Sequence, residues 1–123
     1  MKIIISIAIA GALGAVLRYA VVSLVGARFF PFGTLSVNVL GSFLMGIAYV
    51  VVVEKALTSP DLKPLLMTGA LGAFTTFSAF SLETWDLFEK GEVTLALLYI
   101  FVSVILSIGA LWLGVGVTRL SFA

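Results

Sequence analysis

Four long apolar stretches separated by three short polar segments make up almost the whole chain. The stretches cover residues 3–25, 32–53, 64–88 and 93–117. Each one is long enough for a helix that crosses a bilayer, which needs about 20 mostly apolar residues. The polar segments, at residues 26–31, 54–63 and 90–92, are too short to hold a further domain. The pattern predicts an all-α membrane protein, residues 1–123 forming one domain of four transmembrane helices with both termini on one side.

Composition strengthens this interpretation and excludes others. Hydrophobic residues make up 62% of the 123 residues, charged residues only 11%, and the mean hydropathy is +1.27. Soluble domains are about half apolar. The first stretch lacks an A-x-A-like cleavage site, so we interpret it as a helix and not as a signal peptide. The sequence contains no cysteine and no histidine, which leaves no constellation typical of an enzyme.

The positive charges divide almost evenly between the two predicted sides of the membrane. The termini share their side with Lys2, Lys55, Lys63 and Arg119, whereas Arg18, Arg28 and Lys90 belong to the other side. This division of 4 against 3 provides little bias toward one orientation. The chain therefore either inserts with its termini in the cytoplasm or inserts in both orientations. Insertion in both orientations predicts an antiparallel two-fold homodimer.

Polar side chains recur on one face of two predicted helices. Thr34, Asn38 and Ser42 are four residues apart in the second helix, with Asn38 about 9 Å below the membrane surface. The fourth helix carries a similar face, which consists of Tyr99, Ser103 and Ser107. An unpaired amide costs several kcal/mol in hydrocarbon. Asn38 therefore either bonds a neighbouring helix or lines a hydrated path.

The third apolar stretch holds glycines and hydroxyls where plain hydrocarbon is expected. Gly69, Gly72, Thr75 and Thr76 lie in its middle, about 12 to 18 Å deep for the last three. One interpretation is a helix that breaks near the midplane and frees backbone carbonyls for a cation or a pore. The other is an unbroken helix whose threonines bond back to carbonyls four residues earlier.

Two phenylalanines follow this segment and share a helix face, Phe77 and Phe80, with the hydroxyls of Thr76 and Ser78 beside them. Phenylalanine in a membrane helix usually serves as filler. An aromatic ring also has a positive edge, which provides weak donor-like contacts to an anion. Together with the two polar faces, these rings fit one narrow anion pathway.

Ionisable residues are scarce at membrane depth. Arg18 lies deep in the first helix, and Glu83 lies near the end of the third. Arg18 is expected to extend to the interface, to pair with Glu83, or to contact a ligand. Gly11 and Gly14 on the Arg18 face predict close helix packing. No buried glutamate in the first helix is available for proton-coupled export, so the pattern favours anions.

Three segments together resemble the Fluc-type (CrcB-like) fluoride channels of microorganisms. They are GALGAVLRY at residues 11–19, GTLSVNVLGSFLMG at residues 33–46 and GALGAFTTFSAFSLET at residues 69–84. The resemblance implies a dual-topology homodimer in the cell membrane with two antiparallel fluoride pathways. It implies a pathway lined by Asn38, Phe77 and Phe80, a polar track of Thr34, Ser103 and Ser107, and a central sodium ion on the carbonyls of Gly72 and Thr75. Ala73 and Ala79 depart from the family pattern, in which glycine and a hydroxyl residue are common.

We therefore predict a passive fluoride channel whose partners are fluoride, sodium, the lipid bilayer and a second copy of the chain. Nucleic acid is not an expected partner. The alternatives are a small-solute secondary transporter of the four-helix dual-topology type and a non-conducting assembly subunit. A titratable buried carboxylate would favour the transporter, and none is predicted within the apolar cores except Glu83.

Overall fold

The chain folds into helices joined by short turns. The computed structural model describes residues 1–26 and 29–123, and this part contains no strand. The elements are α1 (Lys2–Val25), α2 (Phe32–Ala48), the π-helical η1 (Tyr49–Glu54) and η2 (Pro64–Leu71), α3 (Gly72–Phe74), α4 (Phe77–Glu89) and α5 (Val93–Ser121). Four stretches are long and apolar enough to cross a membrane: Lys2–Val25, Phe32–Glu54, Pro64–Glu89 and Val93–Ser121. The four predicted spans are confirmed, and the last one continues to Ser121.

Glycine and proline set the ends of several helices. Gly26 ends α1 with φ 75°, and Gly91 forms the turn between α4 and α5 with φ 78°. Both angles lie in the left-handed region that favours glycine. Pro31 precedes α2, and Pro64 begins η2, where its missing N–H costs no helical hydrogen bond. Arg28, assigned above to the side opposite the termini, lies outside the described residues.

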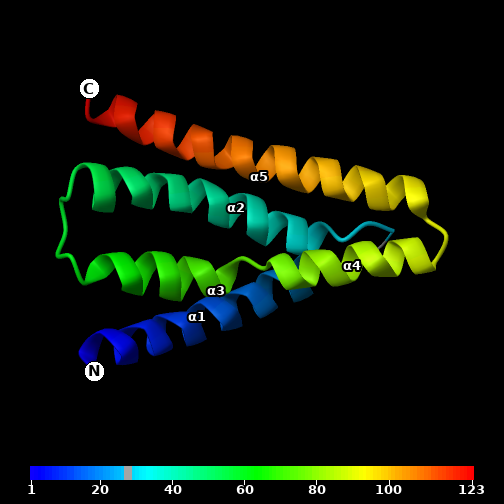
Figure 1. Cartoon of the computed structure of the whole chain (residues 1–123), viewed down its shortest axis with the longest axis horizontal. Helices are drawn as coiled ribbons and strands as arrows, with labels where there is room; N and C mark the ends of the chain where they lie inside the picture. Colours follow the sequence, from blue (N-terminus) through cyan, green and yellow to red (C-terminus); the bar gives the residue numbers. More distant parts are fainter. Residues whose placement is uncertain (27–28) are drawn as a thin grey trace.

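The helices lie side by side along one direction, with both termini at the same end (Figure 1). The second span (α2 and η1) lies between α5 and the third span (η2, α3 and α4) (Figure 1). α1 runs obliquely along η2, α3 and α2. The connection at residues 55–63 lies at the end of the termini, and the turn at residues 90–92 lies at the opposite end (Figure 1).

Glycines permit close approach at two helix contacts. A Cβ on Gly14 would lie against the Ala70 carbonyl, so α1 and η2 pack with almost no space between their backbones. Between α2 and α5, a Cβ on Gly46 would meet the Leu111 carbonyl, and one on Gly114 would meet the Phe43 carbonyl. The predicted packing role of Gly14 is confirmed. Small residues perform this function in membrane helices because dispersion contacts hold the helices together.

The third span changes conformation between α3 and α4. α3 ends at Phe74, Thr75 has ψ 160°, and Thr76 has φ −153° and ψ 118°. Two extended residues therefore separate the helical segments, and α4 begins at Phe77. Thr75 Oγ1 also donates to the Leu71 carbonyl at 3.1 Å, the back-bond predicted above for an unbroken helix. This segment positions the candidate site.

Candidate functional site

The carboxamide of Asn38 faces the extended segment from α2. Its Oδ1 accepts from the Thr76 N–H at 2.7 Å, and its Nδ2 donates to the Thr76 carbonyl at 3.0 Å. Both backbone groups of a residue outside the helices are thus satisfied by one side chain, as buried peptide groups require. The other N–H of Nδ2 has no acceptor among the described residues and remains for a ligand or water. Of the two sequence interpretations, the interhelical hydrogen bond is present.

Asn38 also lines a cavity of about 320 Å³ between α2, the extended segment and α5. The lining consists of Asn38, Gly41, Ser42, Met45, Thr75, Thr76, Phe77, Phe80, Ser103, Val104, Ser107, Ile108 and Leu111. None of these residues carries a charge. The cavity brings together six of the predicted pathway residues, namely Asn38, Thr76, Phe77, Phe80, Ser103 and Ser107.

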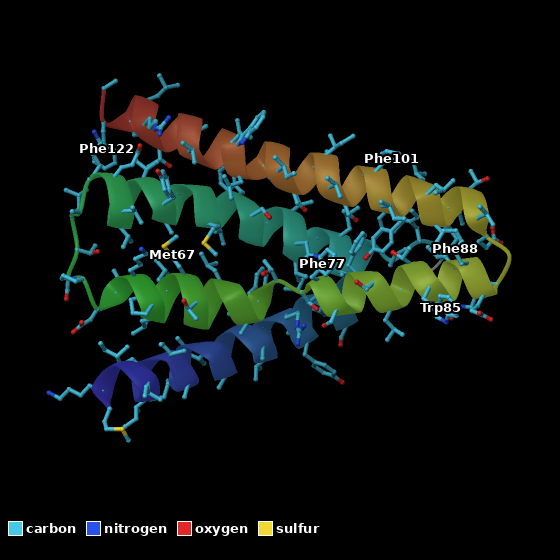
Figure 2. All side chains as sticks on the ribbon, viewed as in Figure 1. Met67, Phe77, Trp85, Phe88, Phe101 and Phe122 are labelled. Carbon is cyan, nitrogen blue, oxygen red and sulfur yellow. The ribbon has the colours of Figure 1, made fainter. Side chains whose placement is uncertain are left out.

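The two predicted phenylalanines differ in burial although their rings are neighbours. Their centroids are 5.5 Å apart with an interplanar angle of 53°. Phe77 is 78% exposed, and Figure 2 shows it at the start of α4. Phe80 is buried, and its ring centroid lies 5.0 Å from that of Tyr99. Packing within this chain therefore accounts for Phe80 and leaves Phe77 unexplained.

The hydroxyls at the cavity are satisfied to different degrees. Thr76 Oγ1 accepts from the Ala79 N–H at 3.1 Å and caps α4, and Ser78 Oγ lies 3.4 Å from the same oxygen. Ser78 is exposed and does not line the cavity. Ser103 Oγ is buried and has no hydrogen-bond partner within residues 1–26 and 29–123. A buried unpaired hydroxyl costs about 1–3 kcal/mol, so this group gains by meeting a ligand or water.

Thr34 and Tyr99 do not line the cavity and instead form a second polar cluster with Glu83. Thr34 Oγ1 donates to Glu83 Oε2, and the Tyr99 hydroxyl donates to Glu83 Oε1, each at 2.8 Å. The ring of Phe30 packs edge-on to Tyr99, with centroids 5.3 Å apart at 81°. Glu83 is therefore held by α2 and α5. We refer to Thr34, Glu83 and Tyr99 as the glutamate cluster.

Of the three alternatives given for Arg18, pairing with Glu83 is not present among the described residues, where the Glu83 carboxylate accepts from the hydroxyls of Thr34 and Tyr99. The ion pairs within residues 1–26 and 29–123 are Lys90 with Asp86 and Arg119 with Glu54. Arg18 itself is half-buried. Tertiary contacts missed from the sequence include the two hydrogen bonds of Arg119 to Glu54, 2.9 and 2.6 Å long, which join α5 to η1.

Gly41 and Met45 also line the cavity and were missed. They follow Asn38 by three and seven residues, so the helical period alone could have identified them. A Cβ on Gly41 would lie against the Thr75 methyl group. Glycine at this position lets the extended segment approach α2 closely enough for Asn38 to reach Thr76.

Gly72 and Thr75, whose carbonyls are predicted to hold sodium, are the first residue of α3 and the residue that follows it. Gly72 is exposed and Thr75 is half-buried. In a continuous helix the Gly72 carbonyl would accept from the Thr76 N–H, but that N–H donates to Asn38 instead. A hard carbonyl oxygen without its helical donor suits an alkali cation. Residues 1–26 and 29–123 contain no group of three or more acidic, cysteine or histidine side chains able to hold a metal.

Comparison with known proteins identifies the family. The model of the CrcB-like proteins, described as "CrcB-like protein, Camphor Resistance (CrcB)", matches residues 5–115. The chain belongs to the CrcB-like family. Within this family it is 51% identical over 121 residues to the "Fluoride-specific ion channel FluC" of Hahella chejuensis, covering 95% of this chain and 94% of the relative. It is 50% identical over 117 residues to the protein of the same name from Magnetococcus marinus, covering 93% and 95%. These CrcB-like relatives are named as ion channels and not as enzymes.

Proposed function

We propose that the protein is a membrane channel that lets fluoride leave the cytoplasm passively. The observation that carries the proposal is about 50% identity, over almost the whole chain, to relatives named as fluoride-specific ion channels. The uncharged polar cavity supports it. Hydrogen fluoride crosses membranes as a neutral molecule and ionises at near-neutral pH, so a passive exit for the trapped anion is sufficient.

The chemistry of the cavity suits a small anion that holds its water strongly. A selective path must replace that water with several donors in a narrow bore. The remaining N–H of Asn38, the Ser103 hydroxyl and the edge of the Phe77 ring are such donors. A lining without a cation attracts fluoride without holding it so tightly that it cannot leave.

The proposed pathway extends from the cavity along neighbouring polar residues. Ser107 continues the α5 face from Ser103, and Ser78 lies beside Thr76 at the start of α4. The glutamate cluster lies one helical turn from Asn38 and Ser103, toward the end of the molecule that carries the turn at residues 90–92. We assign Thr34 and Tyr99 to the polar track at this end, with Glu83 and Arg18 acting electrostatically and structurally.

We further propose that the channel is an antiparallel homodimer with two pathways, built from chains inserted in opposite orientations. The almost even division of lysine and arginine supports this. Cysteines introduced at Ser59 and Glu92, exposed in connections at opposite ends, provide the test. Both sites should react with an impermeant thiol reagent from outside intact cells, each in part of the population. Labelling of one site alone would exclude two orientations.

A sodium ion is the cofactor that we propose for the dimer axis, near the membrane midplane. Gly72 and Thr75 would hold it through two carbonyl oxygens from each chain. Bound there, it would supply a fixed positive charge between the two copies. The exposure of Gly72 and the diversion of the Thr76 N–H support this assignment.

The function is tested by fluoride efflux from liposomes that contain the purified protein. Vesicles loaded with potassium fluoride should release fluoride when valinomycin lets potassium follow, and vesicles loaded with potassium chloride should retain their chloride. Retention of fluoride by vesicles that demonstrably contain folded protein would contradict the proposal. Release that requires a proton or sodium gradient would favour a secondary transporter.

A further inference from the structure

The two hydrogen bonds between Asn38 and Thr76 affect the backbone of the third span as well as the cavity that Asn38 lines. The Thr76 N–H has two competing acceptors, the Gly72 carbonyl in a continuous helix and Asn38 Oδ1 in this structure. The bond to Oδ1, at 2.7 Å, removes this N–H from Gly72. The partner bond from Nδ2 satisfies the Thr76 carbonyl at 3.0 Å, so neither backbone group of this buried residue lacks a partner.

We propose that Asn38 is a positioning residue, which holds Thr75 and Thr76 extended and thereby releases the Gly72 carbonyl to bind the axial cation. The inference rests on the proposed function, because it concerns the proposed sodium site. It adds a second role for Asn38, since one carboxamide would organise both the anion cavity and the cation site.

The chemistry of this position requires a carboxamide. Pairing with both the N–H and the C=O of one residue needs a donor and an acceptor held side by side, which asparagine provides and aspartate does not. Gly41, one turn along α2, keeps the two segments close enough, because a Cβ there would meet the Thr75 side chain. Thr76 Oγ1 accepts from the Ala79 N–H, so this group at the start of α4 is satisfied without help from Gly72.

The neighbouring bonds leave Gly72 among the carbonyls at the end of α3 that lack their helical donors. Both the N–H and the Oγ1 of Thr75 donate to the Leu71 carbonyl, each at 3.1 Å. Both donors of Thr75 thus go to the Leu71 carbonyl, and neither goes to the Gly72 carbonyl. Gly72 is also exposed on the surface of the chain, where a second copy can reach it.

Thermal unfolding in detergent, with sodium or with N-methylglucamine as the only cation, measures the effect on the cation site. Sodium should raise the melting temperature of the parent. Asn38→Ala and Asn38→Asp should lose most of that increase. Ser42→Ala is the matched control, because Ser42 lines the same cavity one turn along α2 and has no hydrogen bond to Thr76 in the described part of the chain. The control should keep the sodium response of the parent, whatever its effect on fluoride flux.

Hydrogen exchange at the Thr76 amide, followed by NMR, measures the hydrogen bonding of Asn38 to Thr76 directly and needs no cation. Asn38→Ala should speed exchange about tenfold through loss of one hydrogen bond. Asn38→Asp places an acceptor where the Thr76 carbonyl needs a donor, so it cannot make both bonds and should also speed exchange. If Asn38→Ala fails to fold, the exchange rates of the parent and of Asn38→Asp still test the role of Asn38. Rapid exchange at Thr76 in the parent, as fast as in residues 55–63, would show that Asn38 does not hold the Thr76 amide.

The outcomes separate this inference from the proposed function. Asn38 variants that fold and keep the full sodium response would overturn the inference even if the parent conducts fluoride. A parent without any sodium response would also overturn it, because the released carbonyl would then have no cation to serve. A parent that responds to sodium through Asn38 but releases no fluoride would support the inference and contradict the channel.

Discussion

Two polar clusters lie one helical turn apart on the same two helices, and they are satisfied to different degrees. Thr34 and Tyr99 belong to the glutamate cluster, where each hydroxyl donates to a carboxylate oxygen at 2.8 Å. Four residues further along α2 and α5, Asn38 keeps one free N–H and the Ser103 hydroxyl is buried without a partner in the described chain. Spacing and side-chain chemistry are similar in the two places.

The difference arises from the third span. Opposite Thr34 and Tyr99, α4 presents the Glu83 carboxylate, whereas opposite Asn38 and Ser103 the helix is replaced by extended backbone and a cavity. A satisfied cluster stabilises the fold, and its hydroxyls can donate to a passing anion only by giving up a bond to Glu83. An incompletely satisfied one gains hydrogen bonds only by binding something. The comparison therefore predicts that substitutions in the two places separate stability from transport.

The largest effect is expected from the rings at the cavity. Phe77→Ile and Phe80→Ile keep the bulk but remove the positive ring edge, and each should abolish fluoride efflux from liposomes while the protein still folds. Phe77 is 78% exposed, so packing within the chain cannot explain such a loss. Phe101→Ile is the control, because Phe101 is also exposed, at 63%, and lies on α5 away from the cavity lining (Figure 2). If both cavity variants released fluoride at the parent rate, the two rings would have only a structural role and the pathway would run elsewhere.

Substitutions in the glutamate cluster should lower the stability of the protein. Tyr99→Phe removes a buried hydroxyl that donates to a carboxylate, a hydrogen bond worth about 1.5–3 kcal/mol. We expect the melting temperature in detergent to fall and the free energy of unfolding to decrease by that amount. An unchanged melting temperature would show that the cluster contributes nothing and would remove the contrast with the cavity.

Both polar clusters include residues of α2 and α5, so both depend on the close approach of these two helices. Gly114→Ala places a Cβ against the Phe43 carbonyl and should destabilise the protein by about 1–3 kcal/mol, as overpacking does. Gly116→Ala on the same helix is the control, since a Cβ there meets nothing within 4 Å. The control should be neutral or slightly stabilising in thermal unfolding, because alanine favours a helix. Equal effects of the two substitutions would contradict the packing argument.

The smallest effect on stability is expected at Ser103. Ser103→Ala removes a buried hydroxyl that has no partner in the described chain, so its loss should not lower the free energy of unfolding. Fluoride flux should nevertheless decrease, because a donor is lost from the cavity. A destabilisation as large as that of Tyr99→Phe would mean that the Ser103 hydroxyl is satisfied in the folded protein.

The number, length and order of the spans follow from the sequence alone. Hydrocarbon thickness sets the length of an apolar helix, and the helical period places Asn38 with Thr34, and Ser103 with Tyr99, on one face each. The same period places Phe77 beside Phe80. These features depend only on local geometry and on the cost of exposing polar groups to lipid, so the pattern of residues was sufficient to predict them.

What each face meets was decided only by the tertiary structure. The sequence left Asn38 between an interhelical bond and a cavity, and the structure has both because the extended segment lies opposite α2. The sequence offered Arg18 as one possible partner of Glu83, but packing of α4 against α5 and α2 brought Thr34 and Tyr99 to it. Helical periodicity determines which residues share a face. The face opposite depends on helix crossing and close approach, which arise from contacts between residues distant in the chain.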